Sequence, residues 1–464
     1  MQMIPSNYLI DLLATIAQRS RPWGPRAPSP AQDRRSTAEL CELLLTDLGD
    51  VSSNKVSRGL LAKYAAMTWD EKLAFFDLLA RDFDIDADEV SQLAAAYAKA
   101  PNAKTLAKLT AAAEPRRQEI LRRLNRVAGA TGDLVEMRCD LLRALPNAPE
   151  LESIDHDFLH LFRSWFNQGF LVLRRIGWHT PANILEKIIA YEAVHAIDNW
   201  DELRLRLQPE DRRCYAYFHP CMPEEPLIFV EVALTRGVAD NIQNVLAEQR
   251  KPLAPDAADT AVFYSISNCQ DGLRGISFGN SLIKQVVEDL HTALPNLTTF
   301  VTLSPIPGFR RWAETADLPV GEAEALHAAM LTSETNTDPK TTETLRRAAA
   351  QYLIAMKRPK GDPLDPVARF HLGNGALVHN VNAGADISPN GIRQSAGLMV
   401  NYLYDINQID KNIEGYSASR TVAHSRALTG YLKSLPAKSN APDTGAKKTA
   451  AGKETAQPAP KTHS

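Results

Sequence analysis

A strand-like run, a glycine-bearing loop and a helix-like run follow one another in the middle of the chain. The run "AVFYSIS" (261–267) precedes Gly272, Gly275 and Gly279, and apolar residues then recur at helical spacing over 280–294. The N–H groups at a helix N-terminus attract anions, and glycine lets a phosphate approach the backbone closely. The loop is neither a Walker A motif nor a GxGxxG motif, so it predicts a phosphate-binding turn of another kind. An ordinary strand-to-helix turn without a ligand is the alternative.

A hydroxyl and an imidazole that could do chemistry lie downstream of this loop. Ser304 ends the strand-like run 296–304 directly before "PIPGF", whose prolines cannot extend a regular ladder. We therefore expect the chain to turn out of the sheet there and to leave a hydroxyl at the end of a strand. His371, in "RFHLGNGA", could transfer protons near neutral pH. Each residue also has a structural interpretation, since Ser304 can cap a turn and His371 can be a packed, hydrogen-bonded core residue.

Three other groups of reactive side chains favour structural roles. His156 and His160 have the i,i+4 spacing of a metal pair, but the sequence offers no evident third ligand, which favours two histidines on a helix surface. Cys214 and Cys221 are interpreted as buried or surface thiols and not as nucleophiles. Arg274, in the glycine loop, could contact a phosphate or be solvated. No metal site is predicted.

The elements that must position these residues fall into two patterns. From about residue 37 to 165 the chain is rich in alanine and leucine at helical spacing, with Thr37 as the cap of 37–49 and a Thr68–Glu71 capping box before 69–83. From about 165 onward strand-like runs alternate with helical ones. The strand-like runs are 169–176, 212–220, 227–235, 261–267 and 296–304. The helical ones are 180–194, with Thr180 as N-cap and Pro181 in the first turn, 280–294 and about 320–357.

Length and composition bound the kind of protein. The 464 residues predict two domains, and a net charge of −3 argues against a general nucleic-acid binder. Five scattered cysteines without a CxxC pair predict no disulfide framework and fit a reducing cytosol. Residues 1–20 resemble a short amphipathic helix and not a signal peptide, and no uncharged apolar run reaches membrane-spanning length. We expect a soluble cytoplasmic protein whose polar tail beyond residue 435 is disordered.

Several multi-residue motifs in a fixed order resemble the malonyl-CoA decarboxylase family. They are "AVFYSIS", "GLRGISFGNSLIKQVV", "LSPIPGF" (303–309), "RFHLGNGA" (369–376) and "GLMVNYLY" (397–404), with "LFRSWFNQGFLVLRRI", "EKIIAYEAVHAI" and "EEPLIFVEVALT" upstream. The similarity covers about residues 150–410, and the N-terminal region fits the family's helical domain more loosely. Two departures are Ser277, where some members have an acidic residue, and a C-terminus that reads "KTHS" and not Ser-Lys-Leu.

The resemblance implies a fold of class α+β. An all-α helical bundle, residues 1–165, precedes a catalytic domain, residues 166–435, that resembles the CoA-dependent N-acetyltransferase (GNAT) fold with a mixed central sheet. A disordered tail, 436–464, follows. The family further implies a homo-oligomer, a tetramer, with subunit contacts through the helical domain.

The resemblance also implies the chemistry and its residues. The reaction is decarboxylation of malonyl-CoA to acetyl-CoA and CO2 through a thioester enolate, without a metal or organic cofactor. Ser304 and His371 correspond to the family's catalytic residues, and Tyr404 to a pocket tyrosine that holds the substrate carboxylate or the enolate oxygen. Tyr404 can alternatively be an aromatic residue of the core. Asn401 and Tyr402 are weaker candidates for the site. The predicted substrate and CoA contacts are Arg274, Gly275, Ile276, Ser277, Phe278, Gly279, Asn280, Ser304 and His371.

Two other functions stay open at the level of sequence. A CoA-dependent acyltransferase of GNAT type would need an acceptor site. A catalytically silent malonyl-CoA sensor would bind without releasing CO2, and the presence of both Ser304 and His371 counts against it. Malonate breakdown and fatty-acid control are both open as the pathway served, and so is a preference for malonyl-CoA over methylmalonyl-CoA.

Overall fold

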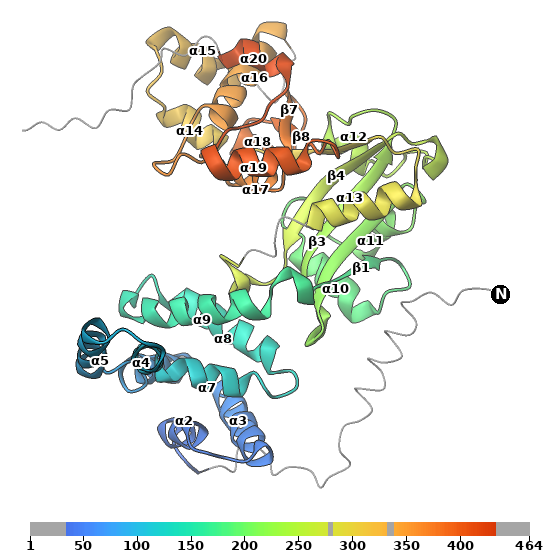
Figure 1. Ribbon diagram of the computed structural model, residues 1–464. Coiled ribbons are helices and arrows are strands. Elements are labelled where there is room, and N and C mark those ends of the chain that lie inside the picture. The colour runs from blue at the N-terminus through green and yellow to red at the C-terminus, as the bar shows by residue number, and fades with distance from the viewer. Residues whose placement is uncertain (1–33, 277–281, 332–337, 433–464) are drawn as a thin grey trace, which may run out of the picture.

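The chain forms a helical bundle, a twisted sheet and a C-terminal lobe (Figure 1). The computed structural model describes residues 34–276, 282–331 and 338–432. The predicted N-terminal helix, the C-terminal tail and four residues of the glycine loop, Ser277, Phe278, Gly279 and Asn280, lie outside these ranges.

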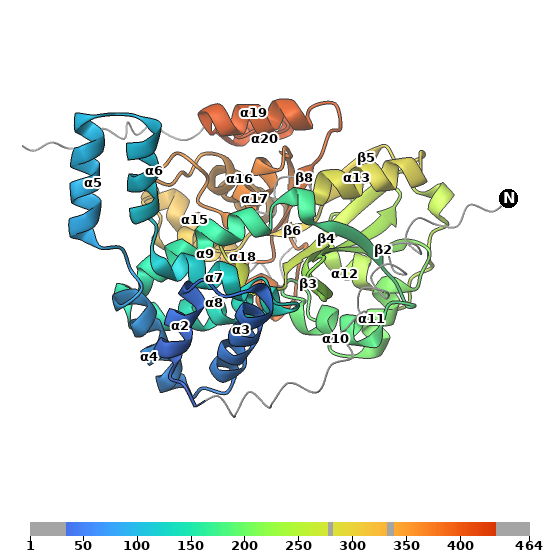
Figure 2. The ribbon, with the colours of Figure 1, turned by 60° about the horizontal axis from the view of Figure 1, so that its bottom comes forward.

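Eight α-helices build the bundle among the described residues. They are α2 (Thr37–Leu45), α3 (Asp50–Ala65), α4 (Trp69–Arg81), α5 (Ala87–Lys99), α6 (Ala103–Ala112), α7 (Arg116–Leu124), α8 (Ala130–Ala144) and α9 (Glu152–Trp165). Their apolar faces meet in one core, which is made mostly by residues from Leu40 to Phe166 and also contains Met222, Leu227, Leu273 and Ile276. The helices α5 and α6 are an exception, because they lie side by side at the edge of the molecule and bury no residue (Figure 2).

The caps of the bundle helices follow the sequence pattern with one correction. The predicted capping box of α4 is confirmed, since Thr68 accepts from the backbone of Glu71 and the Glu71 side chain accepts from that of Thr68. The predicted Thr37 cap is wrong, because Ser36 makes the capping box with Glu39 and Thr37 is the first helical residue. A serine one position earlier has the same reach to the third N–H group of the helix.

A mixed eight-stranded sheet forms the middle of the molecule, as the α+β class predicts. The strands are β1 (Val172–Ile176), β2 (Arg212–His219), β3 (Met222–Thr235), β4 (Thr260–Asn268), β5 (Thr299–Thr302), β6 (Ser304–Pro305), β7 (Leu377–Asn382) and β8 (Met399–Leu403). Their order is β1-β2-β3-β4-β5-β8-β6, with β7 also paired to β8. All pairs are antiparallel except β4–β5, which is parallel.

Helix α13 (Leu282–Ala293) makes the crossover between the two parallel strands. Its buried face is made by Ile283, Val286, Val287 and Leu290, which pack on the sheet as their helical spacing predicts. The predicted order of strand, loop, helix and strand is therefore present.

The strand predicted over 296–304 is divided in two. β5 ends at Thr302, and Ser304 and Pro305 pair with Val400 and Met399 of β8. The expectation that the chain turns out of the sheet at Ser304 is therefore wrong, because Ser304 and Pro305 continue on β8, with which Val301 of β5 is already paired. The parallel pairing of β4 and β5 covers Thr260–Phe263 of β4, which then continues to Asn268 without β5. The two strands diverge from that point.

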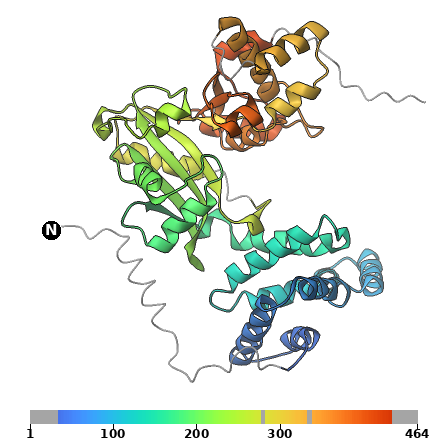
Figure 3. The same cartoon turned by 180° about the vertical axis from the view of Figure 1, so that it is seen from behind.

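Smaller helices cover the sheet and build the C-terminal lobe, which Figure 3 shows from behind. They are α10 (Ala182–Tyr191), α11 (Trp200–Leu207), α12 (Ile242–Leu246), α14 (Phe309–Thr315), α15 (Val320–Leu331), α16 (Pro339–Ile354), α17 (Pro366–Gly373), α18 (Pro389–Ser395), α19 (Ile409–Ser419) and α20 (Arg426–Leu432). The predicted Thr180 cap of α10 is wrong: Pro181 is the N-cap, and the Thr180 hydroxyl accepts from the backbone of Gly177 instead. No helix among the described residues is both long and apolar enough to span a membrane.

Candidate active site

Ser304, His371 and Tyr404 lie together in one hydrogen-bonded chain. The Ser304 Oγ is 3.2 Å from His371 Nε2, and the Tyr404 Oη is 2.7 Å from His371 Nδ1. All three side chains are buried. They come from β6, from α17 and from the residue that follows β8, so segments far apart in sequence meet at one imidazole. The structure thus brings together the three residues that the sequence predicts to be catalytic.

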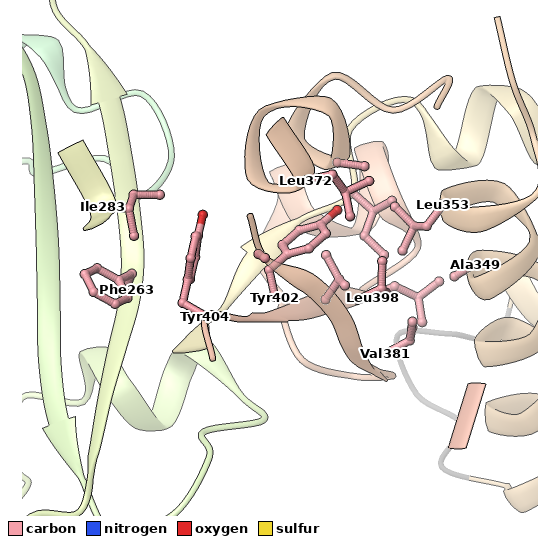
Figure 4. Close-up of a cluster of buried hydrophobic side chains, with 14 of the residues drawn as sticks. Phe263, Ile283, Ala349, Leu353, Leu372, Val381, Leu398, Tyr402 and Tyr404 are labelled. Atoms are coloured by element: carbon pink, nitrogen blue, oxygen red, sulfur yellow. The ribbon is translucent and has the colours of Figure 1, made fainter. Parts of the chain in front are cut away.

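Two features orient the His371 ring. Helix α17 begins at Pro366 with Asp365 as its N-cap, whose carboxylate accepts from the backbone N–H of Ala368 at 2.7 Å. This cap fixes the start of the eight-residue helix that carries His371 in its last turn. From β8, the Tyr402 ring stacks on the imidazole with 4.5 Å between ring centroids and an interplanar angle of 23°. Figure 4 shows Tyr404 between Phe263 and Ile283 on one side and Tyr402 on the other.

Thr302 accepts a hydrogen bond from Ser304, and the sequence analysis does not predict it as a site residue. Its Oγ1 accepts from Ser304 Oγ at 2.9 Å and from the backbone N–H of Tyr402 at 3.1 Å. A signal was present, because residues two apart in an extended chain face the same side. Asn401, a weaker candidate, donates to the carbonyls of Thr302 and Ala239 at 2.8 and 3.0 Å, so it supports the backbone of the site and does not join the hydroxyl–imidazole chain.

Burial sets the protonation of these groups. Desolvation lowers the pKa of His371 to about 3, so the ring is neutral at pH 7. Desolvation also raises the pKa of Tyr404 well above its ordinary value, which keeps its hydroxyl protonated. Among the described residues His371 is the hydrogen-bond partner of the Tyr404 hydroxyl, so that proton is satisfied when it points at Nδ1. We therefore assign the imidazole proton to Nε2, where it faces Ser304 Oγ.

A cavity of about 220 Å³ opens beside Ser304 and His371, where β4 and β5 diverge. Its walls are largely apolar, and Asn268, Ser304 and His371 are polar residues among its lining. The full lining is Val194, Phe263, Tyr264, Ile266, Asn268, Ser304, Pro305, Pro366, Val367, Phe370 and His371. A mostly apolar space with a hydroxyl and an imidazole on its wall suits a small acyl group with a reactive carbonyl.

One wall of this cavity depends on Glu192, which is not among the predicted site residues. The buried Glu192 carboxylate accepts from the backbone N–H groups of Val194 and His195, both at 2.8 Å, and from the Ser265 hydroxyl at 2.7 and 2.8 Å. These bonds pin the segment after α10 against β4. The position of Val194 in the cavity wall follows from this contact.

The glycine loop differs from the turn that the sequence predicts. Residues Asp271–Leu273 form a 3-10 turn that packs on α8 of the bundle, so the chain leaves the sheet before it returns to α13. Gly275 has φ of +81°, a conformation that favours glycine. The Arg274 side chain is exposed and pairs with Asp271 at 3.3 Å, and Ile276 is buried in the bundle core. None of Arg274, Gly275 and Ile276 lines the cavity.

The histidine pair and the cysteines that the sequence analysis considers do not form reactive sites among the described residues. His156 and His160 are both exposed, and no cluster of three or more metal-ligating side chains occurs among the described residues. All five cysteines are free thiols. Burial raises the pKa of the Cys214 thiol far above its usual range, whereas Cys221 is exposed.

Two family models match successive parts of the chain. Residues 83–166 match the malonyl-CoA decarboxylase N-terminal domain, and residues 169–441 match the malonyl-CoA decarboxylase C-terminal domain. The chain is 34% identical to the mitochondrial malonyl-CoA decarboxylase of Anser anser anser over 397 residues, which are 76% of this chain and 78% of that protein. It is 32% identical to the protein of the same name from Rattus norvegicus over 398 residues, 76% of this chain and 80% of that protein.

Solved structures agree with the family models. The chain is similar to a crystal structure of malonyl-CoA decarboxylase from Rhodopseudomonas palustris, with 48% identity, a TM-score of 0.79 and coverage of 85% of this chain and 98% of that one. The malonyl-CoA decarboxylase structure from Agrobacterium vitis has 46% identity and a TM-score of 0.79, and the match covers 85% of this chain and 99% of that one. These relatives place the chain among the carboxy-lyases. The chain belongs to the malonyl-CoA decarboxylase family.

The depressed pKa of His371 makes a prediction about acid stability. Above pH 6.5 the imidazole is neutral in the folded and the unfolded chain. As the pH falls from 6.5 toward 3, the unfolded chain binds a proton that the folded protein does not, so stability is lost over this window. This group accounts for at most about 1.4 kcal/mol per pH unit. We expect His371→Gln to flatten the pH dependence of the urea midpoint between pH 6.5 and 4.

The matched control for this measurement is His156→Gln, at an exposed position of α9. It should leave the slope of the wild-type curve in place. Equal slopes for the wild type and His371→Gln would contradict the assignment of a neutral buried imidazole.

Proposed function

We propose that the chain decarboxylates malonyl-CoA to acetyl-CoA and CO2 at the Ser304–His371–Tyr404 site. The observation that carries this proposal is the buried chain of two hydroxyl groups and one imidazole on the wall of a small, mostly apolar cavity. Membership of the malonyl-CoA decarboxylase family supplies the substrate.

The reaction asks little of the protein beyond placement and one proton. The thioester carbonyl is an electron sink β to the carboxylate, so the C–C bond can break to give CO2 and an enolate without a metal or an organic cofactor. The enzyme has to hold that bond in line with the carbonyl π system and then protonate the enolate carbon. The mostly apolar cavity wall favours loss of the carboxylate charge, because the carboxylate is desolvated there and CO2 is neutral.

The proton balance gives His371 its role in this proposal. The neutral ring of the free enzyme holds its proton on Nε2. An entering substrate carboxylate favours the imidazolium, since an opposite charge nearby raises the pKa of the ring. The proton that makes the imidazolium enters from solvent as the substrate binds. Loss of CO2 moves the negative charge to the enolate. Ser304 Oγ then gives its proton to carbon and takes the Nε2 proton of His371, which leaves a neutral ring with its proton on Nδ1. Proton exchange with solvent restores the Nε2 form.

Tyr404 serves both protonation states of the ring. It donates to Nδ1 of the neutral imidazole, and its oxygen accepts from Nδ1–H when the ring is charged. This arrangement supports a positioning and charge-stabilising role for Tyr404. The hydroxyl reaches His371 and not the lining of the cavity.

An assay of the purified protein tests the activity. With malonyl-CoA and EDTA we expect acetyl-CoA and CO2 to form in equal amounts. Binding of malonyl-CoA without CO2 would instead support the silent sensor, and transfer of an acyl group to an added amine would support an acyltransferase. Either of these two results would overturn the proposal.

Three variants test the residue roles. Ser304→Ala and His371→Ala should each lower kcat by about 10²- to 10⁴-fold, because each removes a proton-transfer group. Tyr404→Phe keeps the ring and should lower kcat by about 10- to 100-fold, because it removes one hydrogen bond to a charged group. Ser395→Ala is the control: Ser395 is also buried, but its hydroxyl donates to the carbonyls of Gly391 on α18 and of Leu398, which follows that helix. Near wild-type turnover in a folded Ser304 or His371 variant would contradict the assignment.

We propose the CoA contacts and the domain division on similar grounds. Arg274, Gly275, Ile276, Ser277, Phe278, Gly279 and Asn280 are proposed to hold the CoA pyrophosphate, supported by their place between β4 and α13. The division into 1–165, 166–435 and a tail of 436–464 is supported by an apolar core made mostly by residues between Leu40 and Phe166. Cytoplasmic location is supported by five free thiols.

A tetramer formed through the helical bundle is proposed as the oligomer. The helices α5 and α6 support it, because none of their side chains is buried within a single chain, and an isolated helical hairpin is marginally stable. Light scattering of the purified protein should give four subunits, and a monomer would contradict this proposal.

A further inference from the structure

One arginine of the helical bundle holds the segment that follows β4. Arg138 lies on α8 and is 1% exposed. Its Nη1 donates to the backbone carbonyls of Gly272 at 2.7 Å and Arg274 at 2.8 Å, and its Nε donates to the carboxylate of Asp155 on α9 at 2.8 Å. A buried guanidinium thus connects two bundle helices to the start of the glycine loop.

The rest of the segment fits the same surface. A Cβ on Gly272 would lie 2.0 Å from the carbonyl oxygen of Val135, so only glycine allows this approach of the two backbones. Leu273 and Ile276 are buried in the apolar core of the bundle. Figures 1 and 3 show the segment leaving the sheet after β4 and lying against the bundle near α9. The segment 271–276 is therefore seated by the bundle and not by the sheet from which it emerges.

We propose that Arg138 is a positioning residue for CoA binding, and that the helical bundle forms part of the substrate site. The proposal rests on the proposed function, because it takes Arg274, Gly275 and Ile276 as part of the CoA contact. Arg138 acts on that contact through its two bonds to the backbone of the segment. It touches neither the cavity nor the Ser304–His371 pair.

The chemistry of the contact explains why a cation is needed. Both acceptors are carbonyl oxygens that lie at the start of the loop and outside the ladder of β4. A guanidinium carries several donors in a fixed fork, so it can bind two carbonyls and a carboxylate at once. Asp155 compensates the buried charge. An uncharged side chain of similar length would leave the carbonyls and Asp155 without their partner, and the segment would lose its fixed path.

The experiment compares three full-length variants under the assay described above. Arg138→Met should raise the KM for malonyl-CoA about tenfold with kcat changed less than about twofold, as expected for loss of charge-assisted bonds that position a binding segment. Arg138→Lys should recover part of the loss, because an ammonium can still reach one carbonyl. Arg117→Met is the matched control: Arg117 is an equally buried bundle arginine that pairs with Asp84 and Asp157 and makes no bond to the segment.

The control separates positioning from general stability. Arg117→Met should lower the thermal midpoint about as much as Arg138→Met and leave KM unchanged. An unchanged KM in Arg138→Met, or an equal rise of KM in Arg117→Met, would overturn the proposal. If Arg138→Met does not fold, Asp155→Asn, which weakens the hold on the Arg138 side chain, should raise KM in the same direction, and an unchanged KM there would overturn it too.

A binding measurement keeps this result distinct from a failure of the proposed function. Calorimetry with CoA alone reports the site without any turnover. A wild type that binds CoA but releases no CO2 would remove the proposed function, while about tenfold weaker CoA binding by Arg138→Met would still support the positioning role. Equal CoA affinity of the two proteins would overturn it.

Discussion

The site depends on one buried imidazole that is satisfied on both nitrogens. A neutral histidine without solvent must find a donor for one nitrogen and an acceptor for the other, and an unmet group costs about 1–3 kcal/mol. Tyr404 and Ser304 meet these two needs for His371, and Tyr402 covers a face of the ring. Because the three partners come from the two strand segments β6 and β8, this imidazole fixes how α17 sits on the sheet.

The divergence of β4 and β5 makes that meeting possible. If β5 continued along β4, residue 304 would lie within the parallel ladder and no space would separate the strands. Instead Leu303 makes the last backbone bond to Phe263, and the chain leaves β4 while it stays paired with β8 through Ser304. The loss of β4 as a partner opens the cavity, and the continued pairing with β8 keeps Tyr402 and Tyr404 beside His371. The cavity and the hydrogen-bonded chain are therefore two results of one feature of the sheet.

The sequence predicts the features that depend on neighbouring residues and the features that the family motifs contain. The apolar stripe of α13, the Thr68 capping box and most strands follow from periods of two and 3.6 residues, which short windows contain. Ser304 and His371 follow as candidates from their residue types and positions, but their catalytic roles, and that of Tyr404, follow from the family motifs. The continuation of the chain on β8 at Ser304 is not predicted, because it depends on a strand that lies nearly a hundred residues further along the chain.

The glycine loop illustrates the same limit in another form. Its glycines were interpreted as an approach for phosphate, and Gly272 is required by the approach of another backbone, that of Val135 on α8. No pattern within 269–287 contains that neighbour. Different parts of the molecule therefore position different parts of the site. Strands β4 and β6 build one side of the cavity, and α17 carries the imidazole. The bundle holds the segment that leads from β4 to α13. A small rotation of the bundle against the sheet would move residues 271–276 with it through Arg138, whereas Ser304 and His371 would keep their distance. The segment proposed to bind CoA and the Ser304–His371 pair are thus held by different contacts, so the two can change independently.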